Sequence, residues 1–198
     1  MRRRAQAGYT MLEIMISVVV MTIGATGILA MQGASVRSNQ DASETSVALN
    51  FATTWMERIK RDARLWTQQT NANLINNTKY LKLLNTAANV WTVPTTTAPE
   101  SAGADYFGFD TPVATGDVRY CVNVRFRAAH LLNNQWDAVR ADVMVWWHRN
   151  AQDSTRNAQA CATALTDAQV QSLTTADRKL RKHLLSTVVS WRDPTIWP

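Results

Sequence analysis

Residues 8–36 of the chain read GYTMLEIMISVVVMTIGATGILAMQGASV, and the rest of the architecture follows from this stretch. Its only ionisable side chains are those of Tyr9 and Glu13, and the residues from Ile14 to Val36 carry no charge. About 20 apolar residues, rising about 1.5 Å each along a helix, cross the hydrocarbon core of a bilayer. The stretch therefore predicts a membrane-spanning helix. Arginines at positions 2–4 would stay on the cytoplasmic side, with the remaining chain on the other side.

An ordinary secretory signal peptide also begins with basic residues and an apolar run. Its apolar region typically spans about 7–15 residues and ends at small residues, whereas this run is longer and continues into a helical pattern. A carboxylate at Glu13 would cost about 2.5–3.5 kcal/mol deep in lipid, although less near the membrane end. We therefore expect a retained helix in which Glu13 has a function.

The segment GYTMLE at residues 8–13, with a short basic leader before it and an apolar run after it, resembles a known signal. It is similar to the class III signal of type IV pilins and type II secretion pseudopilins. The resemblance implies that prepilin peptidase removes the leader, residues 1–8, by cutting between Gly8 and Tyr9. It also implies N-methylation of Tyr9, which stands where phenylalanine is commoner. Glu13 is then the fifth residue of the mature chain, where the family carries a glutamate.

The resemblance also implies a role for Glu13 in assembly. Its carboxylate would pair with the positively charged N-terminal amine of a neighbouring subunit, because either charge alone is costly in an apolar environment. The implied partners are other minor and major pilins, prepilin peptidase, the inner-membrane assembly platform and, before assembly, membrane lipid.

The helix is expected to continue from a transmembrane half, residues 9–34, into an amphipathic half, residues 35–66. In the second half apolar side chains recur at spacings of three and four residues, which forms one stripe along a helix. The stripe consists of Val47, Phe51, Trp55, Ile59, Ala63 and Trp66. We expect it to pack against a globular head.

The remaining chain divides by composition into a connecting region, 67–117, and a sheet head, 118–198. The connecting region is rich in Thr, Asn, Ala, Gly and Pro. The head contains three segments of alternating apolar and polar residues, at 118–127, 139–148 and 185–191, which predict strands. Three antiparallel strands that cover the helix stripe give the expected fold class, an α+β pilin fold with a long N-terminal helix on a small antiparallel sheet.

The two cysteines, Cys121 and Cys161, are 40 positions apart and form no CxxC pair. Outside the cytoplasm they would form a disulfide, and inside it they would more often be two buried thiols. Because the head is expected to be periplasmic, we expect a disulfide. Cys161 falls in a segment, 160–181, that is expected to form a helix and a loop.

Composition and motifs argue against catalysis. The net charge is +6, but the leader arginines supply three of those charges, so the mature chain carries 18 basic against 15 acidic residues. The three histidines lack the spacing of metal ligands, and Asp105, Asp110 and Asp117 lack the calcium-loop pattern. Neither a phosphate-cradling GxxxxGK[ST] nor a GxSxG elbow occurs. We therefore expect no enzyme activity, no metal and no cofactor.

The adjacent residues Trp146 and Trp147 must point to opposite faces of a strand. The tryptophan on the outer face could join Arg119, Arg125 and Arg127 in a surface that binds DNA or a host surface. The favoured alternative is ordinary aromatic packing beneath a loop or against a neighbouring subunit.

Short segments at residues 23–32 and 55–62 are similar to those of PilV-type minor pilins. The resulting hypothesis is a minor pilin that helps to initiate or prime pilus assembly and so supports motility or adhesion. A type II secretion pseudopilin and a tip subunit that binds DNA or surfaces are the alternatives. The expected location is the bacterial inner membrane, with a single pass and a periplasmic head, and then the pilus filament near its tip.

Overall fold

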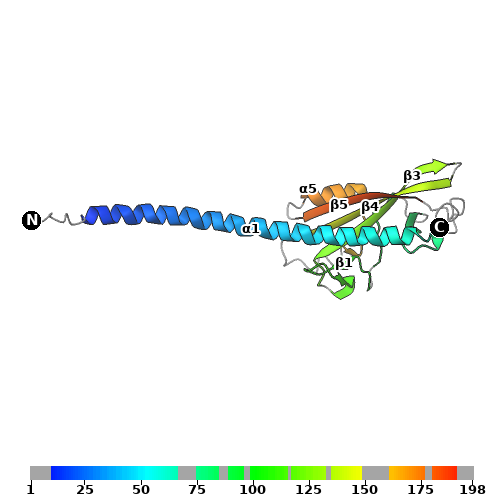
Figure 1. Ribbon diagram of the computed structural model, residues 1–198, viewed down its shortest axis with the longest axis horizontal. Helices are drawn as coiled ribbons and strands as arrows, with labels where there is room; N and C mark the ends of the chain where they lie inside the picture. The colour runs from blue at the N-terminus through cyan, green and yellow to red at the C-terminus, as the bar shows by residue number, and fades with distance from the viewer. Residues whose placement is uncertain are drawn as a thin grey trace, which may run out of the picture. The chain divides into compact units, whose positions relative to one another are not determined.

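The computed structural model describes residues 10–66, 75–84, 89–95, 99–115, 117–132, 135–148, 161–176 and 180–190. The chain forms two compact units, residues 1–43 and residues 44–198. The long helix α1, Met11–Ala63, contributes to both (Figure 1). Its 53 residues confirm the predicted long N-terminal helix, with bounds that differ slightly from 9–66.

In the second unit a five-stranded antiparallel sheet has the strand order β2-β1-β3-β4-β5. Three strands are long: β3, Tyr120–Leu132, β4, Gln135–His148, and β5, Leu180–Ser190. They correspond to the three strands that alternation predicts. The short strands β1, Gly103–Ala104, and β2, Asp110–Thr111, extend the sheet from within the connecting region.

The two short strands were not expected, because two residues are too few to show a period-two pattern. Pairing in the register Gly103↔Cys121 and Ala104↔Tyr120 places β1 beside the start of β3. A short 3-10 helix, Val113–Thr115, follows β2 and leads back toward β3. The sheet is therefore wider than expected, and β2 and β5 form its two edges.

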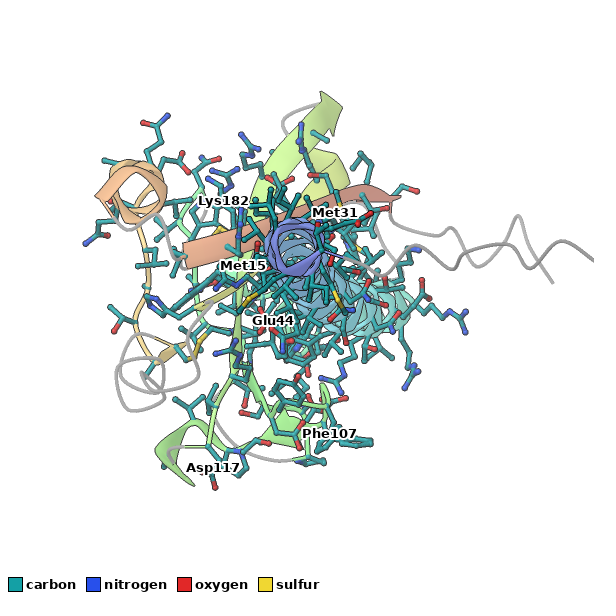
Figure 2. All side chains as sticks on the ribbon, turned by 90° about the vertical axis from the view of Figure 1, so that its left-hand side faces the viewer. Met15, Met31, Glu44, Phe107, Asp117 and Lys182 are labelled. Carbon is teal, nitrogen blue, oxygen red and sulfur yellow. A yellow bond between two sulfur atoms is a disulfide. The ribbon has the colours of Figure 1, made fainter. Side chains whose placement is uncertain are left out.

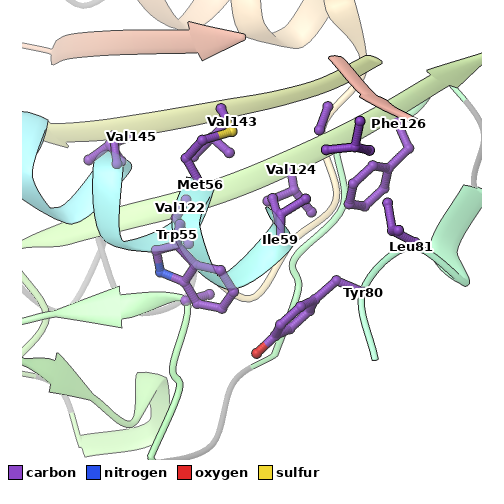
Figure 3. Close-up of a cluster of buried hydrophobic side chains, with 14 of the residues drawn as sticks. Trp55, Met56, Ile59, Tyr80, Leu81, Val122, Val124, Phe126, Val143 and Val145 are labelled. Atoms are coloured by element: carbon purple, nitrogen blue, oxygen red, sulfur yellow. The ribbon is translucent and has the colours of Figure 1, made fainter. Parts of the chain in front are cut away.

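The main hydrophobic core lies between α1 and one face of the sheet (Figure 3). The predicted helix stripe is buried there from Phe51 to Trp66, and Val47 is partly buried. The side chains of Trp55 and Ile59 are fully buried, and Trp55 packs edge-to-face on Tyr80, with ring centroids 5.4 Å apart. Alternate residues of β3 and β4 supply the other side of this core. They are Tyr120, Val122, Val124, Phe126, Val139, Ala141, Val143, Val145 and Trp147.

A second core covers the opposite face of the sheet. The helix α5, Asp167–Ala176, lies on this side, within the segment where a helix and a loop are predicted (Figure 1). Trp146 is 2% exposed in this core, whereas its neighbour Trp147 belongs to the core beneath α1. Both predicted orientations are therefore confirmed, and the outer tryptophan is covered, as the packing alternative requires.

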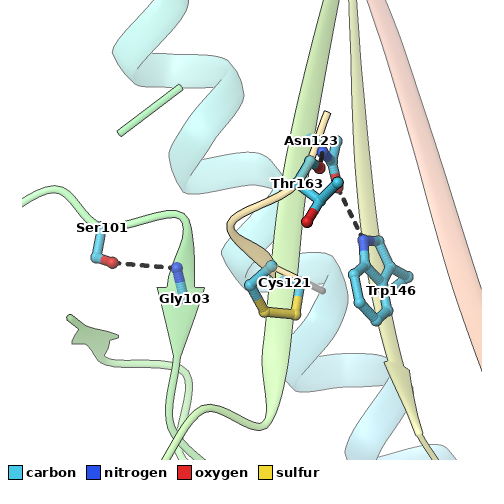
Figure 4. The surroundings of a disulfide bond; sticks show 7 residues. Ser101, Gly103, Cys121, Asn123, Trp146 and Thr163 are labelled. Carbon is cyan, nitrogen blue, oxygen red and sulfur yellow. Dashed lines mark hydrogen bonds between the residues drawn. A yellow bond between two sulfur atoms is a disulfide. The ribbon is translucent and has the colours of Figure 1, made fainter. Parts of the chain in front are cut away.

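The predicted disulfide joins Cys121 of β3 to Cys161, with the two Cα atoms 5.1 Å apart (Figure 4). Beside it the Asn123 side chain accepts a hydrogen bond from Trp146 Nε1 at 2.8 Å and donates one to the Thr163 carbonyl at 3.3 Å. The segment that carries Cys161 is thus held over the outer face of the sheet by one covalent bond and by polar contacts.

Candidate processing and assembly segment

The described part of the N-terminal segment begins at Thr10, which precedes the first residue of α1. The Thr10 carbonyl accepts hydrogen bonds from the amides of Glu13 at 3.0 Å and Ile14 at 3.3 Å. The Thr10 hydroxyl oxygen accepts a longer one from the Glu13 amide at 3.4 Å. Thr10 therefore acts as the N-cap, and the Thr-x-x-Glu spacing matches a capping box. This Thr-x-x-Glu spacing is a local pattern that is visible in the sequence.

Three hydroxyl side chains within the apolar half of α1 are satisfied inside the helix. The hydroxyls of Ser17, Thr22 and Thr26 each donate a hydrogen bond to a carbonyl three residues earlier, at 2.8 Å in every case. Such internal bonds remove the cost of placing a free hydroxyl in lipid. The outer surface of this half is consequently apolar although it contains three hydroxyl residues.

The apolar side chains of this half are exposed in the isolated chain. Within the described residues, α1 is the one helix that is long and apolar enough to cross a membrane, by length and composition. The exposed set comprises Met11, Leu12, Ile14, Met15, Ile16, Val18, Val19, Val20, Met21, Ile23, Ile28, Leu29, Met31 and Val36. A continuous apolar surface of this size requires a cover, either lipid or other apolar helices.

Two of the predicted site residues, Gly8 and Tyr9, lie outside the described residues. Glu13 lies in the first turn of α1 and is exposed. A carboxylate in the first helical turn interacts favourably with the free backbone N–H groups at the N-terminus of the helix. Cleavage between Gly8 and Tyr9, methylation of Tyr9 and the pairing of Glu13 in a filament stay predictions.

The arginines proposed as an outer binding surface are largely engaged within the head. Arg119 is buried, and its Nη2 atom donates to Glu44 Oε1 of α1 at 2.6 Å, while Trp147 Nε1 donates to the other Glu44 oxygen at 3.1 Å. Arg125 is also buried and forms ion pairs with Asp142 and Asp167. Two of these three arginines are therefore covered within the head, Arg119 by α1 and Arg125 by the α5 segment, which favours the packing alternative. Binding of DNA or a host surface stays a prediction.

The carboxylate of Asp142, fully buried on the outer face of β4, gathers the charges of this region. It accepts hydrogen bonds from Arg125 Nη2 at 3.0 Å, Arg127 Nη2 at 2.6 Å, Arg140 Nε at 2.8 Å and Ser186 Oγ at 2.6 Å. Burial alone would raise the pKa of Asp142, but the bonds from Ser186 and from the three arginines outweigh it and lower the pKa to about 2. The cluster links β3, β4 and β5 through side-chain hydrogen bonds and ion pairs.

Comparison with known proteins finds a family model that matches the N-terminal segment. Residues 3–29 match the family model described as the prokaryotic N-terminal methylation motif. The matched range includes Gly8, Tyr9 and Glu13 and ends within the apolar half of α1. No curated protein and no solved structure matches the chain.

A class III signal, an exposed apolar helix and an α+β head with an antiparallel sheet together define a pilin-like fold with the features of a membrane anchor. The methylation motif supports a type IV pilin-like protein of a pilus or a pseudopilus. It points to a structural subunit that associates with other pilins after processing by prepilin peptidase, rather than to an enzyme.

Proposed function

We propose that the chain is a minor pilin of a type IV pilus, of the PilV type, which helps to prime pilus assembly from the inner membrane. The observation that carries the proposal is the exposed apolar half of α1, most of which lies within the methylation motif. Such a surface is covered by lipid before assembly and by neighbouring helices afterwards. The protein acts by subunit packing and performs no turnover.

Glu13 guides the transfer from lipid to filament in this proposal. After cleavage the new N-terminus at Tyr9 carries a positive charge, and a neighbour's Glu13 carboxylate neutralises it as both enter the apolar filament core. A pair of opposite charges loses far less free energy there than either charge alone. Before assembly, the position of Glu13 in the first turn of α1 offsets part of the cost of its charge, because the N-terminal end of a helix favours a negative charge.

The minor-pilin assignment is supported by the resemblance of residues 23–32 and 55–62 to PilV-type sequences. Within 55–62 the structure gives several side chains defined roles in holding the head. Trp55 and Ile59 are core residues, Arg58 forms an ion pair with Asp110, and Asp62 anchors the segment after α1. The similarity in this segment therefore concerns residues at the end of α1 that pack against the globular head.

Deletion and complementation in the native host test the proposal. We expect the deletion strain to lose most surface pili and twitching motility while type II secretion continues, and the intact gene to restore both. Loss of secretion with normal pili would instead identify a pseudopilin and reject the pilus assignment.

Substitutions at two positions separate processing from assembly. Gly8→Val should leave the leader in place, visible as an unshifted mass of the membrane-bound chain. Glu13→Val should be cleaved normally but be depleted from sheared filaments, whereas Glu13→Asp, which keeps the charge, should be depleted less. Normal incorporation of Glu13→Val would contradict the pairing account.

A further inference from the structure

The strand β5 forms one edge of the head sheet. It pairs with β4 on one side, and among the residues that the structure describes no strand pairs with its other side. The free side of an edge strand presents backbone N–H and C=O groups that can pair with the backbone of another strand. Figure 2 shows Lys182 of β5 and Phe107, which belongs to the loop between β1 and β2 at the other edge, on opposite sides of the head.

β5 lacks the features that usually protect an edge strand from pairing. These features are a very short strand, a bulge, a proline or charged side chains along the strand. The other edge strand, β2, is protected by its length of 2 residues. β5 has 11 residues and pairs with β4 in an unbroken register, and residues 184–190 contain neither a charge nor a proline. This part of β5 is therefore a regular edge that can accept a further strand.

Two apolar side chains on the outer face of β5 are exposed. Leu184 and Val188 are 50% and 60% exposed, whereas Leu180, on the same face, is buried in the second core together with Val170 of α5. The cover formed by α5 therefore leaves this part of the strand open. A strand added beside β5 would place its own side chains next to Leu184 and Val188 and remove part of their apolar surface from water.

The start of this open edge is positively charged. Arg181 and Lys182 are both exposed, and within the described part of the chain neither belongs to an ion pair. No acidic residue occurs in β5 to balance them. Two free cations at the start of an uncharged edge favour a partner strand that carries carboxylates.

The far end of the edge is also positively charged. A groove of about 290 Å³ lies there between the last turns of α1 and the end of β5, and it is lined by Glu57, Lys60, Ala63, Arg64, Val189 and Ser190. Glu57 is paired with Lys60, so the exposed Arg64 leaves an excess of positive charge. The bond from Lys60, together with the charges of Arg61 and Arg64, lowers the pKa of Glu57. A carboxylate of a partner strand is therefore favoured at this end as well.

A second copy of β5 does not suit this edge. The start of β5 pairs with Trp147, which donates to Glu44, and its last residue lines the groove with Arg64, so β5 runs in the same direction as α1. Antiparallel pairing of two copies of β5 would set the α1 helices of the two heads antiparallel, whereas anchors in one membrane enter it from the same side. Parallel pairing would bring the Lys182 side chains of the two copies together. The partner strand therefore belongs to another protein.

We propose that β5 binds an extended, acidic segment of another protein by strand addition. The bound segment forms backbone hydrogen bonds with β5, covers Leu184 and Val188 with its own side chains, and places carboxylates near Lys182 and Arg64. The inference goes beyond the proposed function, since it concerns the head alone and requires neither the anchor nor a filament.

Binding of defined peptides to the full-length chain in detergent tests the strand addition. The acidic probe is a fluorescent peptide of about nine residues, a usual strand length, in which valine and threonine alternate and glutamates occupy both ends. The control probe carries lysines in place of the glutamates. Fluorescence anisotropy at low salt should show about tenfold tighter binding of the acidic probe, because several exposed charge pairs are exchanged for repulsions. Equal binding of the two probes, or no binding of the acidic probe, would overturn the proposal.

Hydrogen exchange locates the bound probe on the chain. The outward N–H groups of β5 gain partners in the complex, so exchange in residues 180–190 should slow about threefold or more when the acidic probe is in excess. Exchange in residues 105–109, the loop at the other edge, should stay unchanged. Slowing of both segments, or of neither, would show that the probe does not add to β5.

Two substitutions at exposed positions of β5 test the edge and its charge. Val188→Asp places an acid on the uncharged edge and should weaken binding of the acidic probe about tenfold, whereas Phe107→Asp, the matched change at the other edge, should leave it unchanged. Lys182→Glu should weaken binding of the acidic probe and strengthen that of the lysine probe. A misfolded chain would not produce this reversal.

Two results with these variants would contradict the proposal. One is an equal effect of Val188→Asp and Phe107→Asp. The other is self-association of the chain without any probe that Val188→Asp abolishes, which would identify a second copy as the occupant of the edge. Neither result bears on the pilus assignment, which the deletion strain tests separately.

Discussion

Asp142 shows how a single buried carboxylate can link three strands. Its partners Arg125 and Arg127 lie on β3, Arg140 lies on β4 and Ser186 on β5. The carboxylate is fully buried, so its charge depends on these donors rather than on water. The arginines in turn depend on it, since its removal would leave positive charges crowded together.

We predict that Asp142→Asn destabilises the full chain by about 3–5 kcal/mol, the usual cost of breaking a buried ion pair from one side. Chemical denaturation of the detergent-solubilised chain, followed by tryptophan fluorescence, measures the free energy of unfolding. Glu57→Gln is the matched control, because Glu57 pairs with Lys60 on the exposed face of α1 and its loss should leave the midpoint unchanged. Equal effects of the two substitutions would contradict the stabilising role of Asp142 between the three strands.

The pH dependence of the same network has a defined sign. The folded pKa of Asp142, about 2, lies below the value of about 3.9 for an unfolded aspartate. Its contribution to stability is therefore present above pH 4 and is lost as the pH falls from about 4 to about 2. Denaturation midpoints measured through that window should fall more steeply for the wild type than for Asp142→Asn. Parallel curves would show that other acids control the transition.

Asp62 holds the segment that follows the helix. Its two carboxylate oxygens accept hydrogen bonds from the amides of Lys79 at 2.7 Å, Tyr80 at 2.7 Å and Leu81 at 3.1 Å. The Tyr80 ring then packs on Trp55, and Leu81 is fully buried. Asp62 therefore ties residues 79–81 to the end of α1.

We predict that Asp62→Ala costs about 1–3 kcal/mol, because buried amides lose their acceptor. Hydrogen exchange should quicken most at the amides of Tyr80 and Leu81, and mass spectrometry of the corresponding peptide measures this change. Asp62→Asn keeps one carbonyl acceptor and should show a smaller effect. Unchanged exchange in this peptide for Asp62→Ala would contradict the anchoring role.

The disulfide and α5 act together as a cover for the outer face of the sheet. Antiparallel backbone bonds join Leu165 to Trp91, at 2.8 and 3.2 Å, and the Arg125 guanidinium lies 4.2 Å from the centre of the Trp91 ring. Val170 of α5 then contributes to the second core beside Trp146. The disulfide fixes the start of this cover on β3.

We predict that replacing both Cys121 and Cys161 with alanine destabilises the chain by about 4 kcal/mol, as expected for a bond that closes a loop of this length. The outer face should open before the core beneath α1, and trypsin should then cleave after Arg125 or Lys182 at lower denaturant concentrations. Reduction of the wild-type chain supplies an independent control with the same expected loss. No change in either protein would mean that the polar contacts hold the cover unaided.

The division of the chain into two units has a consequence for solubility. The buried core begins at Ala48, and the polar contact from α1 to Arg119 and Trp147 begins at Glu44. The exposed apolar run ends at Val36, apart from the half-exposed Leu49. The head therefore contains its whole core without the apolar half of the helix.

We predict that residues 44–198, exported to the periplasm, form a water-soluble, disulfide-bonded protein with cooperative thermal unfolding. Its melting temperature should lie within a few degrees of that of the full chain in detergent. Addition of residues 10–43 should restore the requirement for detergent. Aggregation or non-cooperative unfolding of 44–198 would show that the head needs the first unit to fold.

The sequence alone supports much of this architecture, because its strongest patterns are local. An uncharged apolar run, a helix stripe at spacings of three and four and three alternating strands each leave a periodic signal, and the folded chain contains all of them. The methylation motif is likewise a contiguous signal, so Gly8, Tyr9 and Glu13 could be singled out without coordinates. The cysteine count and the expected compartment favoured a disulfide, but only the fold brings Cys121 and Cys161 within bonding distance.

Pairings between distant residues depended on the fold. Three such pairings join positions that share no periodic pattern: Glu44 with Arg119, Asp62 with the amides after residue 78, and Asp142 with its arginines. In the sequence, each of these acids is indistinguishable from an ordinary solvent-exposed charge. The strands β1 and β2 are too short to be periodic and exist because β3 offers them a partner. Which arginines were free to bind, and which edge of the sheet stays open, was decided by chain segments that meet only after folding, since burial is a property of neighbours in space and not in sequence.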